Sequence, residues 1–157
     1  MLAALLATVT LAAPALAANH IKVQGAEFDL CIDNTDGKEV AGNPLQVWKC
    51  YTGSSNQAWN FSDTGKYPTT FKLGDSNLCM GVQQSPLADG APVVLMDCAA
   101  GYDHTTWSAP NGRICLLGTN YCLQLDDDCA HDGTKLKVMT LSTSPSQLWD
   151  VKEPAYE

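Results

Sequence analysis

One stretch of the chain, residues 31–59, combines side chains that suit the binding of a sugar ring. Asp33 offers a carboxylate that can accept hydrogen bonds from adjacent hydroxyls, and Trp48 offers an aromatic plate for the apolar C–H face of a pyranose. Gln46 and Asn56 add amide groups that both donate and accept. Residue types in this order predict a site for a hydroxyl-rich ring.

Cysteines bracket these groups and indicate how they are held. Cys31 and Cys50 lie nineteen positions apart, so a bond between them would clamp the two strands that carry the candidate site. Cys79 and Cys98 have the same separation. We therefore predict two disulfides, each contributing ~3 kcal/mol through loop closure.

Three cysteines remain, namely Cys115, Cys122 and Cys129, and their pairing stays open. We expect Cys129 to bond Cys122 or Cys115. Because the total is seven, at least one thiol is unpaired or bonds another molecule. A zinc site from these residues and His131 is disfavoured, since their gaps are not the tight pairs of a zinc module.

The elements that position the site read as short strands, because apolar runs recur between Gly, Pro, Asn and Asp and no long stretch keeps a helical period. The expected strands form three sets of four. They are 20–24, 28–32, 45–50 and 57–61; then 69–73, 78–82, 93–98 and 105–108; then 113–117, 121–125, 136–141 and 147–151.

A threefold repetition orders these strands. Trp59, Trp107 and Trp149 end equivalent fourth strands, with spacings of 48 and 42 residues, and we expect all three rings in a shared core. Three such units closing on a common axis form a β-trefoil. The sequence therefore predicts an all-β fold with pseudo-threefold symmetry and without a long open sheet edge.

The ordered set C-x-D, an aromatic residue before the second cysteine, and N-Q-x-W resembles the ricin-B-type lectin family (R-type lectins, carbohydrate-binding module family 13), in particular secreted, fungal-like members. The resemblance runs from about residue 20 to 152, and only the first repeat matches in full. It implies a β-trefoil lectin that binds galactose, N-acetylgalactosamine (GalNAc) or xylan-type sugars. The implied sugar-binding set is Asp33, Gln46, Trp48, Asn56 and Gln57, with Gln57 mainly shaping the site.

The other two repeats lack this set. Counting from their cysteines puts Gly81 and Met96 in place of the carboxylate and the ring in the second repeat, and Gln124 and Met139 in the third. We expect neither to bind sugar. The acidic run at residues 126–128 reads as a solvated turn rather than a calcium or sugar-hydroxyl site.

The first eighteen residues form an uncharged apolar run that closes on Ala15-Leu16-Ala17, the pattern of a signal peptide cleaved after Ala17 or Ala18. We therefore expect a secreted protein with one domain over residues 19–157 and no separate catalytic domain.

The net charge of −8 argues against nucleic acid or membrane partners. Asn60-Phe61-Ser62 is a glycosylation sequon that places Asn60 outward.

Enzyme motifs such as G-x-S-x-G, a P-loop or H-E-x-x-H are absent from the sequence. Asp33 and Asp36 could be proposed as a glycosidase pair, but Asp36-Gly37 reads as a turn. We expect a non-enzymatic lectin without cofactor or metal.

Its single site would bind sugar weakly, so an agglutinin would need to be a homo-oligomer, for which the spare cysteine is one route. The alternative is a trefoil with vestigial sugar sites that inhibits a protease or binds another protein.

Overall fold

The computed structural model describes residues 19–62, 68–100, 102–127 and 130–151. The predicted leader and Cys129 lie outside them. Strands dominate this part of the chain, each two to seven residues long. They are β1 (Ile21–Val23), β2 (Leu30–Asn34), β3 (Leu45–Lys49), β4 (Trp59–Asn60), β5 (Lys72–Leu73), β6 (Leu78–Val82), β7 (Ala91–Asp97), β8 (Trp107–Ser108), β9 (Cys115–Leu116), β10 (Tyr121–Leu125), β11 (Leu136–Thr140) and β12 (Trp149–Val151).

Short helical turns lie between the strands in the described part of the chain. They are η1 (Thr35–Gly37), η2 (Ser55–Gln57), α1 (Tyr102–Thr105), η3 (Pro110–Gly112) and η4 (Pro145–Gln147). Three of these turns, η2, α1 and η4, end two residues before a core tryptophan, so the fourth strands begin later than predicted. In η2 the backbone N–H of Ala58 bonds the carbonyl of Ser55, which closes the turn. No helix in the described residues is long and apolar enough to cross a membrane.

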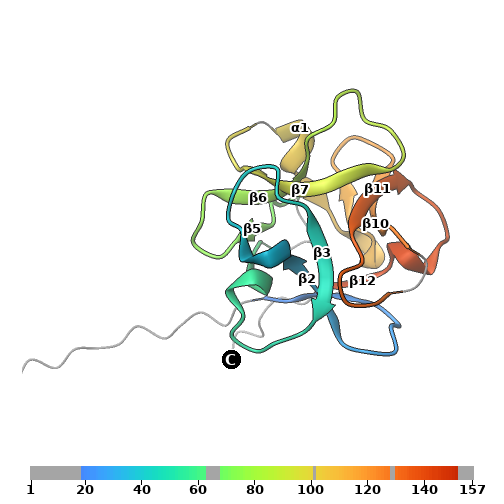
Figure 1. Cartoon of the computed structure of the whole chain (residues 1–157). Coiled ribbons are helices and arrows are strands. Elements are labelled where there is room, and N and C mark those ends of the chain that lie inside the picture. The colour runs from blue at the N-terminus through green and yellow to red at the C-terminus, as the bar shows by residue number, and fades with distance from the viewer. Residues whose placement is uncertain (1–18, 63–67, 101, 128–129, 152–157) are drawn as a thin grey trace, which may run out of the picture.

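The strands pair as three equivalent units. Hairpins β2–β3, β6–β7 and β10–β11 carry five register pairs each, and Figure 1 shows them around the middle of the molecule. Pairs β4–β5, β8–β9 and β12–β1 join one unit to the next, and the last of these closes the ring. The predicted all-β trefoil is confirmed.

The three core tryptophans make the same contact in each unit. The indole Nε1 of Trp59 donates to the carbonyl of Ile32 at 3.0 Å, and those of Trp107 and Trp149 donate to Met80 and Leu123 at 2.9 and 3.1 Å. Each acceptor follows the cysteine of its second strand. All three rings are at most 1% exposed, so burial and a satisfied N–H together fix the repeat.

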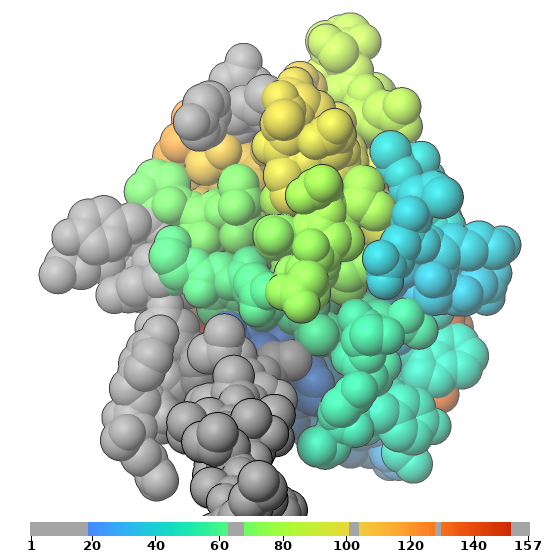
Figure 2. All heavy atoms as spheres, turned by 90° about the vertical axis from the view of Figure 1, so that its left-hand side faces the viewer, coloured from blue at the N-terminus to red at the C-terminus, as the bar shows by residue number. Residues whose placement is uncertain are grey.

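Neighbouring units also bond through their hairpins. Leu95 of the second unit donates its N–H to Asn43 of the first at 2.8 Å, and Val47 of the first donates to Thr134 of the third at 2.8 Å. Figure 2 shows first-unit residues, coloured cyan to teal, lying beside the green residues of the second unit. The first unit is therefore in contact with both of the others.

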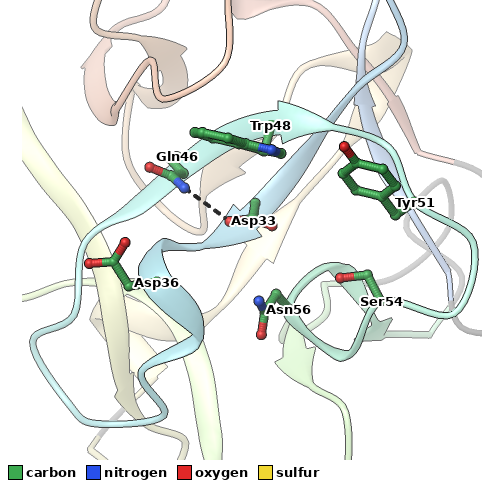
Figure 3. A pocket seen from close by; sticks show the side chains of 7 residues that line it. All are labelled: Asp33, Asp36, Gln46, Trp48, Tyr51, Ser54 and Asn56. Atoms are coloured by element: carbon green, nitrogen blue, oxygen red, sulfur yellow. Dashed lines mark hydrogen bonds between the residues drawn. The ribbon is translucent and has the colours of Figure 1, made fainter.

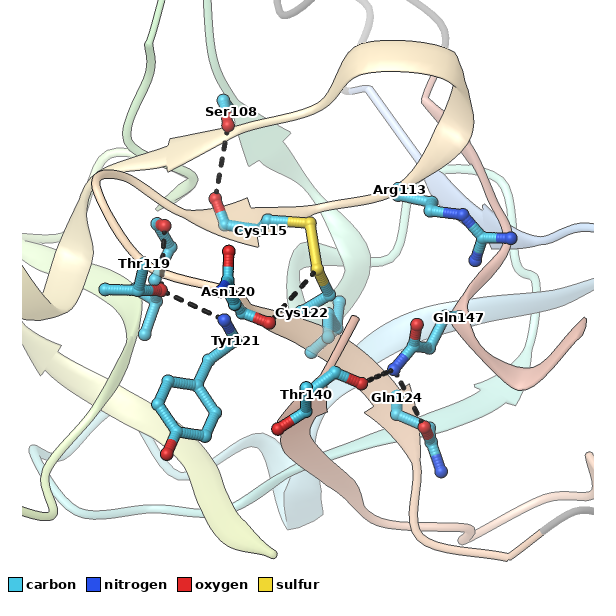
Figure 4. The surroundings of a disulfide bond; sticks show 12 residues. Ser108, Arg113, Cys115, Thr119, Asn120, Tyr121, Cys122, Gln124, Thr140 and Gln147 are labelled. Carbon is cyan, nitrogen blue, oxygen red and sulfur yellow. Dashed lines mark hydrogen bonds between the residues drawn. A yellow bond between two sulfur atoms is a disulfide. The ribbon is translucent and has the colours of Figure 1, made fainter. Parts of the chain in front are cut away.

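Three disulfides lie in the described residues. Cys31–Cys50 and Cys79–Cys98 are the two pairs that the equal spacing predicts. The third joins Cys115 to Cys122, so the expectation that Cys129 bonds one of them is wrong (Figure 4). The reason is register, because β9 and β10 place Cys115 directly opposite Cys122. With both thiols in a disulfide, neither can ligate zinc.

Candidate functional site

The β2–β3 hairpin brings the predicted residues onto one face. Its register places Asp33 opposite Gln46 and Cys31 opposite Trp48. Residues opposite each other, or two apart on one strand, point the same way. The carboxylate, the amide and the indole therefore share a face, and the Cys31–Cys50 disulfide ties the open end of the hairpin.

These side chains line a cleft of about 250 Å³. Figure 3 shows Asp33 at the centre, with Trp48 and Tyr51 on one side and Asn56 and Ser54 on the other. Its lining residues are Asp33, Asp36, Gln46, Trp48, Tyr51, Ser54 and Asn56. Four of the five predicted sugar-binding residues thus meet in one cleft.

Asp33 is the acceptor at the bottom of the cleft. Its side chain is buried, and its two oxygens accept from Nε2 of Gln46 and Nε2 of Gln57, each at 3.1 Å. Burial raises the pKa of Asp33 above its usual value; the two amide donors and the charge of Lys135 act against this rise, while Asp132 adds to it. A carboxylate has about four lone-pair directions, so positions remain for further donors.

Trp48 forms the wall of the cleft. It is 38% exposed, which leaves part of its ring free for a ligand. Its other side is supported by the third unit, where a Cβ at Gly133 would lie 3.7 Å from the indole Cζ3. Tyr51, 52% exposed, adds a second aromatic side chain to the same cleft.

Gln57 is the predicted residue that does not line the cleft. It is completely buried and holds Asp33 from beneath. Its Nε2 also donates to the carbonyl of Lys49 at 2.9 Å, and its Oε1 accepts the N–H of Tyr51 at 2.9 Å. Every donor and acceptor of this amide faces protein, so Gln57 shapes the site without reaching a ligand.

Sequence reasoning missed four residues of this site. Asp36 lies in a turn, as predicted, but its backbone at φ 55° turns the side chain into the cleft lining. Tyr51 and Ser54 follow the second cysteine, and aromatic character at Tyr51 was a usable signal. Lys135, which donates to Gln46, comes from the third unit and gave no signal near the motif.

The second unit has no room for an equivalent site. Gly81 occupies the position of Asp33, and a Cβ there would lie 2.7 Å from the carbonyl oxygen of His104 and 2.8 Å from Sδ of Met96. Backbone and sulfur fill the space that a carboxylate would need. That this repeat binds no sugar stays a prediction.

The third unit keeps the framework of the site without its chemistry. Gln124 stands at the position of Asp33, and its Oε1 accepts from Nε2 of Gln147 at 3.0 Å (Figure 4). Lys137 lies opposite Gln124, with its Nζ 3.0 Å from a carboxylate oxygen of Asp126. Met139 replaces the indole. A neutral amide and a thioether here provide neither the charged acceptor nor the aromatic plate.

A larger hollow of about 500 Å³ lies where Phe28 and Leu30 face the third-unit turn at residues 130–132. Its two carboxylates are already engaged, since Asp29 pairs with Lys22 at 3.4 Å and Asp132 accepts the N–H of Lys49 at 2.6 Å. The described residues contain no group of three metal-ligating side chains. The first-unit cleft differs from this hollow because its lining combines a buried carboxylate, Asp33, with a partly exposed indole, Trp48.

Asn60, the sequon asparagine, has an exposed side chain on β4, as strand alternation predicts. Its Nδ2 donates to the carbonyl of Gly74 at 2.7 Å. N-glycosylation would replace one of the two N–H groups of this atom and leave the other N–H as a donor for the Gly74 carbonyl.

Comparison with known proteins gives a consistent result. The family model described as the ricin-type β-trefoil lectin domain matches residues 19–149. An agglutinin of Ricinus communis is 30% identical over 121 residues, which make up 76% of this chain and 20% of that protein. The chain thus spans about a fifth of the length of this relative.

Solved structures show the same fold. ThreeFoil, a designed threefold-symmetric protein, superposes with a TM-score of 0.73 at 18% identity, covering 86% of this chain and 97% of its own. A ricin B-like lectin of Macrolepiota procera, solved in complex with lactose, has a TM-score of 0.66 at 24% identity and covers 91% of this chain and 100% of its own.

Proposed function

The chain belongs to the ricin-type β-trefoil lectin family, and on that premise we propose that it is a carbohydrate-binding protein with one working site, the first-unit cleft. The observation that carries this proposal is the pairing of a buried carboxylate, Asp33, with a partly exposed indole, Trp48, in one cleft. The other two units offer neither group at the matching positions.

Binding requires no chemical step in this proposal. Asp33 accepts hydrogen bonds from two adjacent sugar hydroxyls through its free lone-pair directions, and Trp48 stacks on the C–H face of the ring. Asn56 and Gln46 lie beside Asp33 in the cleft and supply amide groups that orient the ligand. Carboxylate acceptors and an aromatic plate together favour a pyranose over a purely apolar ligand.

Galactose-type sugars, including GalNAc, are the first candidates, with xylan-type sugars second. The Macrolepiota procera lectin of the same fold was solved with lactose, which supports testing that disaccharide first. A single shallow cleft of this size should bind with a dissociation constant near millimolar, about 4 kcal/mol. Strong attachment to a glycan surface would therefore need several copies.

Secretion is part of the same proposal. Three disulfides in the described residues favour an oxidising compartment, and the apolar leader provides the route to it. N-terminal sequencing of protein recovered from culture medium should find a chain that begins at residue 18 or 19. A chain that keeps residues 1–18 and stays inside the cell would contradict this.

The function is tested by titrating lactose and xylobiose into the wild type, Asp33→Asn and Trp48→Ala, with a glycan array to extend the range. We expect both variants to lose binding at least tenfold. Met139→Ala is the matched control, because Met139 occupies the register position of Trp48 in the third unit. If the folded wild type binds no glycan, the lectin assignment fails, and protease inhibition becomes the function to test.

A further inference from the structure

A lysine from the third unit lies behind the first-unit cleft. The Nζ of Lys135 donates to Oε1 of Gln46 and to Oγ1 of Thr35, both at 2.9 Å. The backbone around it is tied to the first unit, since Gly133 donates its N–H to Val47 at 2.9 Å. Lys135 is half-buried and does not line the cleft.

This contact fixes the orientation of the Gln46 amide. A lysine ammonium has three donors and no acceptor, so only the carbonyl oxygen of Gln46 can face it. The amide nitrogen must then face Asp33, where it donates at 3.1 Å. If the amide turned over, its oxygen would lie against the carboxylate of Asp33, and both groups would be acceptors.

The ammonium also acts on Asp33 through its charge. The charged groups that face Asp33 are Lys135 and Asp132 of the third unit, and Asp36 at the rim of the cleft. Lys135 lowers the pKa of Asp33 and Asp132 raises it, so the lysine opposes both burial and a nearby negative charge.

We propose that Lys135 is a positioning residue of the first-unit sugar site, which holds the Gln46 amide as a donor to Asp33 and keeps that carboxylate ionised. The sugar site of one unit is then completed by a side chain of another. This inference rests on the proposed function for its ligand, but its effect on Asp33 can be measured without any sugar.

The first experiment follows the Asp33 carboxyl carbon by NMR through a pH titration of the ligand-free protein. We expect Lys135→Met to raise the titration midpoint of Asp33, and Lys135→Arg to restore it because Arg keeps both charge and donors. Lys137→Met is the matched control, since Lys137 is a neighbour on the same chain segment and pairs with Asp126. An unmoved midpoint in folded Lys135→Met overturns the proposal.

The second experiment measures lactose affinity against pH. Lys135→Met should weaken binding about tenfold at neutral pH and move the loss of binding to higher pH, while Lys137→Met should match the wild type. Should Lys135→Met fail to fold, Lys135→Gln, which removes the charge but keeps a donor, must raise the Asp33 midpoint. If the wild type binds no sugar, the proposed function fails, and the NMR titration still decides the role of Lys135.

Discussion

The side-chain amide of Gln57 lies beneath Asp33, with its Nε2 donating to the carboxylate at 3.1 Å. Gln147 makes the matching contact with Gln124 in the third unit at 3.0 Å. Each amide also bonds one backbone carbonyl and one backbone N–H near the end of its third strand. The glutamine of the Q-x-W motif thus makes the same set of contacts in the first and third units. The two differ only in the side chain that accepts from Nε2, which is Asp33 in the first unit and Gln124 in the third.

Replacing these two glutamines should show that their effects on stability are similar while their effects on sugar binding differ. Gln57→Ala and Gln147→Ala each remove three hydrogen bonds made by a buried side-chain amide and should lower the free energy of unfolding by about 1–3 kcal/mol. Chemical denaturation checks this. Only Gln57→Ala should also weaken lactose binding, because only Gln57 holds Asp33. Equal losses of binding in both variants would contradict the separate roles of the two units.

Sugar affinity should fall with acid at a higher pH than an exposed aspartate would cause. Burial raises the pKa of Asp33 above the usual value of about 3.9, and a neutral carboxyl accepts hydroxyl hydrogen bonds poorly. Lactose titrations from pH 7 downward should show affinity decreasing through this raised pKa. Circular dichroism at each pH should show that the fold persists. Affinity that stays constant down to pH 4 would be the contrary result.

Protonation of Asp33 should raise the stability of the fold, although it lowers sugar affinity. Because the folded state raises the pKa of Asp33, it binds more protons than the unfolded chain between the two pKa values. The stability from this group is fully present below the unfolded pKa and is lost as pH rises through the folded pKa. Asp33→Asn should remove this part of the pH dependence, as measured by thermal unfolding of both proteins across that window.

The second unit should resist conversion into a binding site. Gly81→Ala should destabilise the fold by about 1–3 kcal/mol, because its Cβ would meet the His104 carbonyl and Met96. Adding Met96→Ala should recover only part of this loss, since the backbone contact remains. Calorimetry of unfolding checks both variants. A Gly81→Ala protein as stable as the wild type would show that the helix α1 can move aside.

The disulfides should differ in their effect on stability. Replacing Cys115 and Cys122 by Ala opens a loop of 7 residues, whereas each of the other pairs closes 19. Loop-closure entropy then predicts that removing a 19-residue pair costs about 1 kcal/mol more. Denaturation of the Cys79→Ala/Cys98→Ala protein provides the comparison away from the site. A larger cost for the short loop would mean that native packing, not chain entropy, dominates.

Much of the fold could be predicted from the sequence, because the three repeats can be aligned with one another. Counting from Cys31, Cys79 and Cys122 gives equivalent positions in the three repeats, and the hairpin registers agree with it: Asp33 pairs with Gln46 in the first unit where Gly81 pairs with Val94 in the second. The third disulfide was missed for a physical reason. Its cysteines face each other across neighbouring short strands, and the exact register of two-residue strands cannot be read from the chain.

The site could be predicted only as far as local sequence reaches. Asp33, Gln46, Trp48 and Asn56 belong to one unit, so motif and spacing bring them together. Lys135 and the turn that supports Trp48 belong to another unit, and only ring closure places them. Gln57 was recognised as shaping the site, but its complete burial follows from packing that spacing does not describe.

The contact between Thr35 and Lys135 joins residues 100 positions apart. A contact of such long range forms more slowly than a local one, because it must close a long loop and so costs more chain entropy. We therefore expect the cleft to mature only after the last hairpin has docked on the first. A folding intermediate in which only the first unit has paired would still bind sugar weakly. The recovery of sugar affinity during refolding should therefore report when the ring of three units closes.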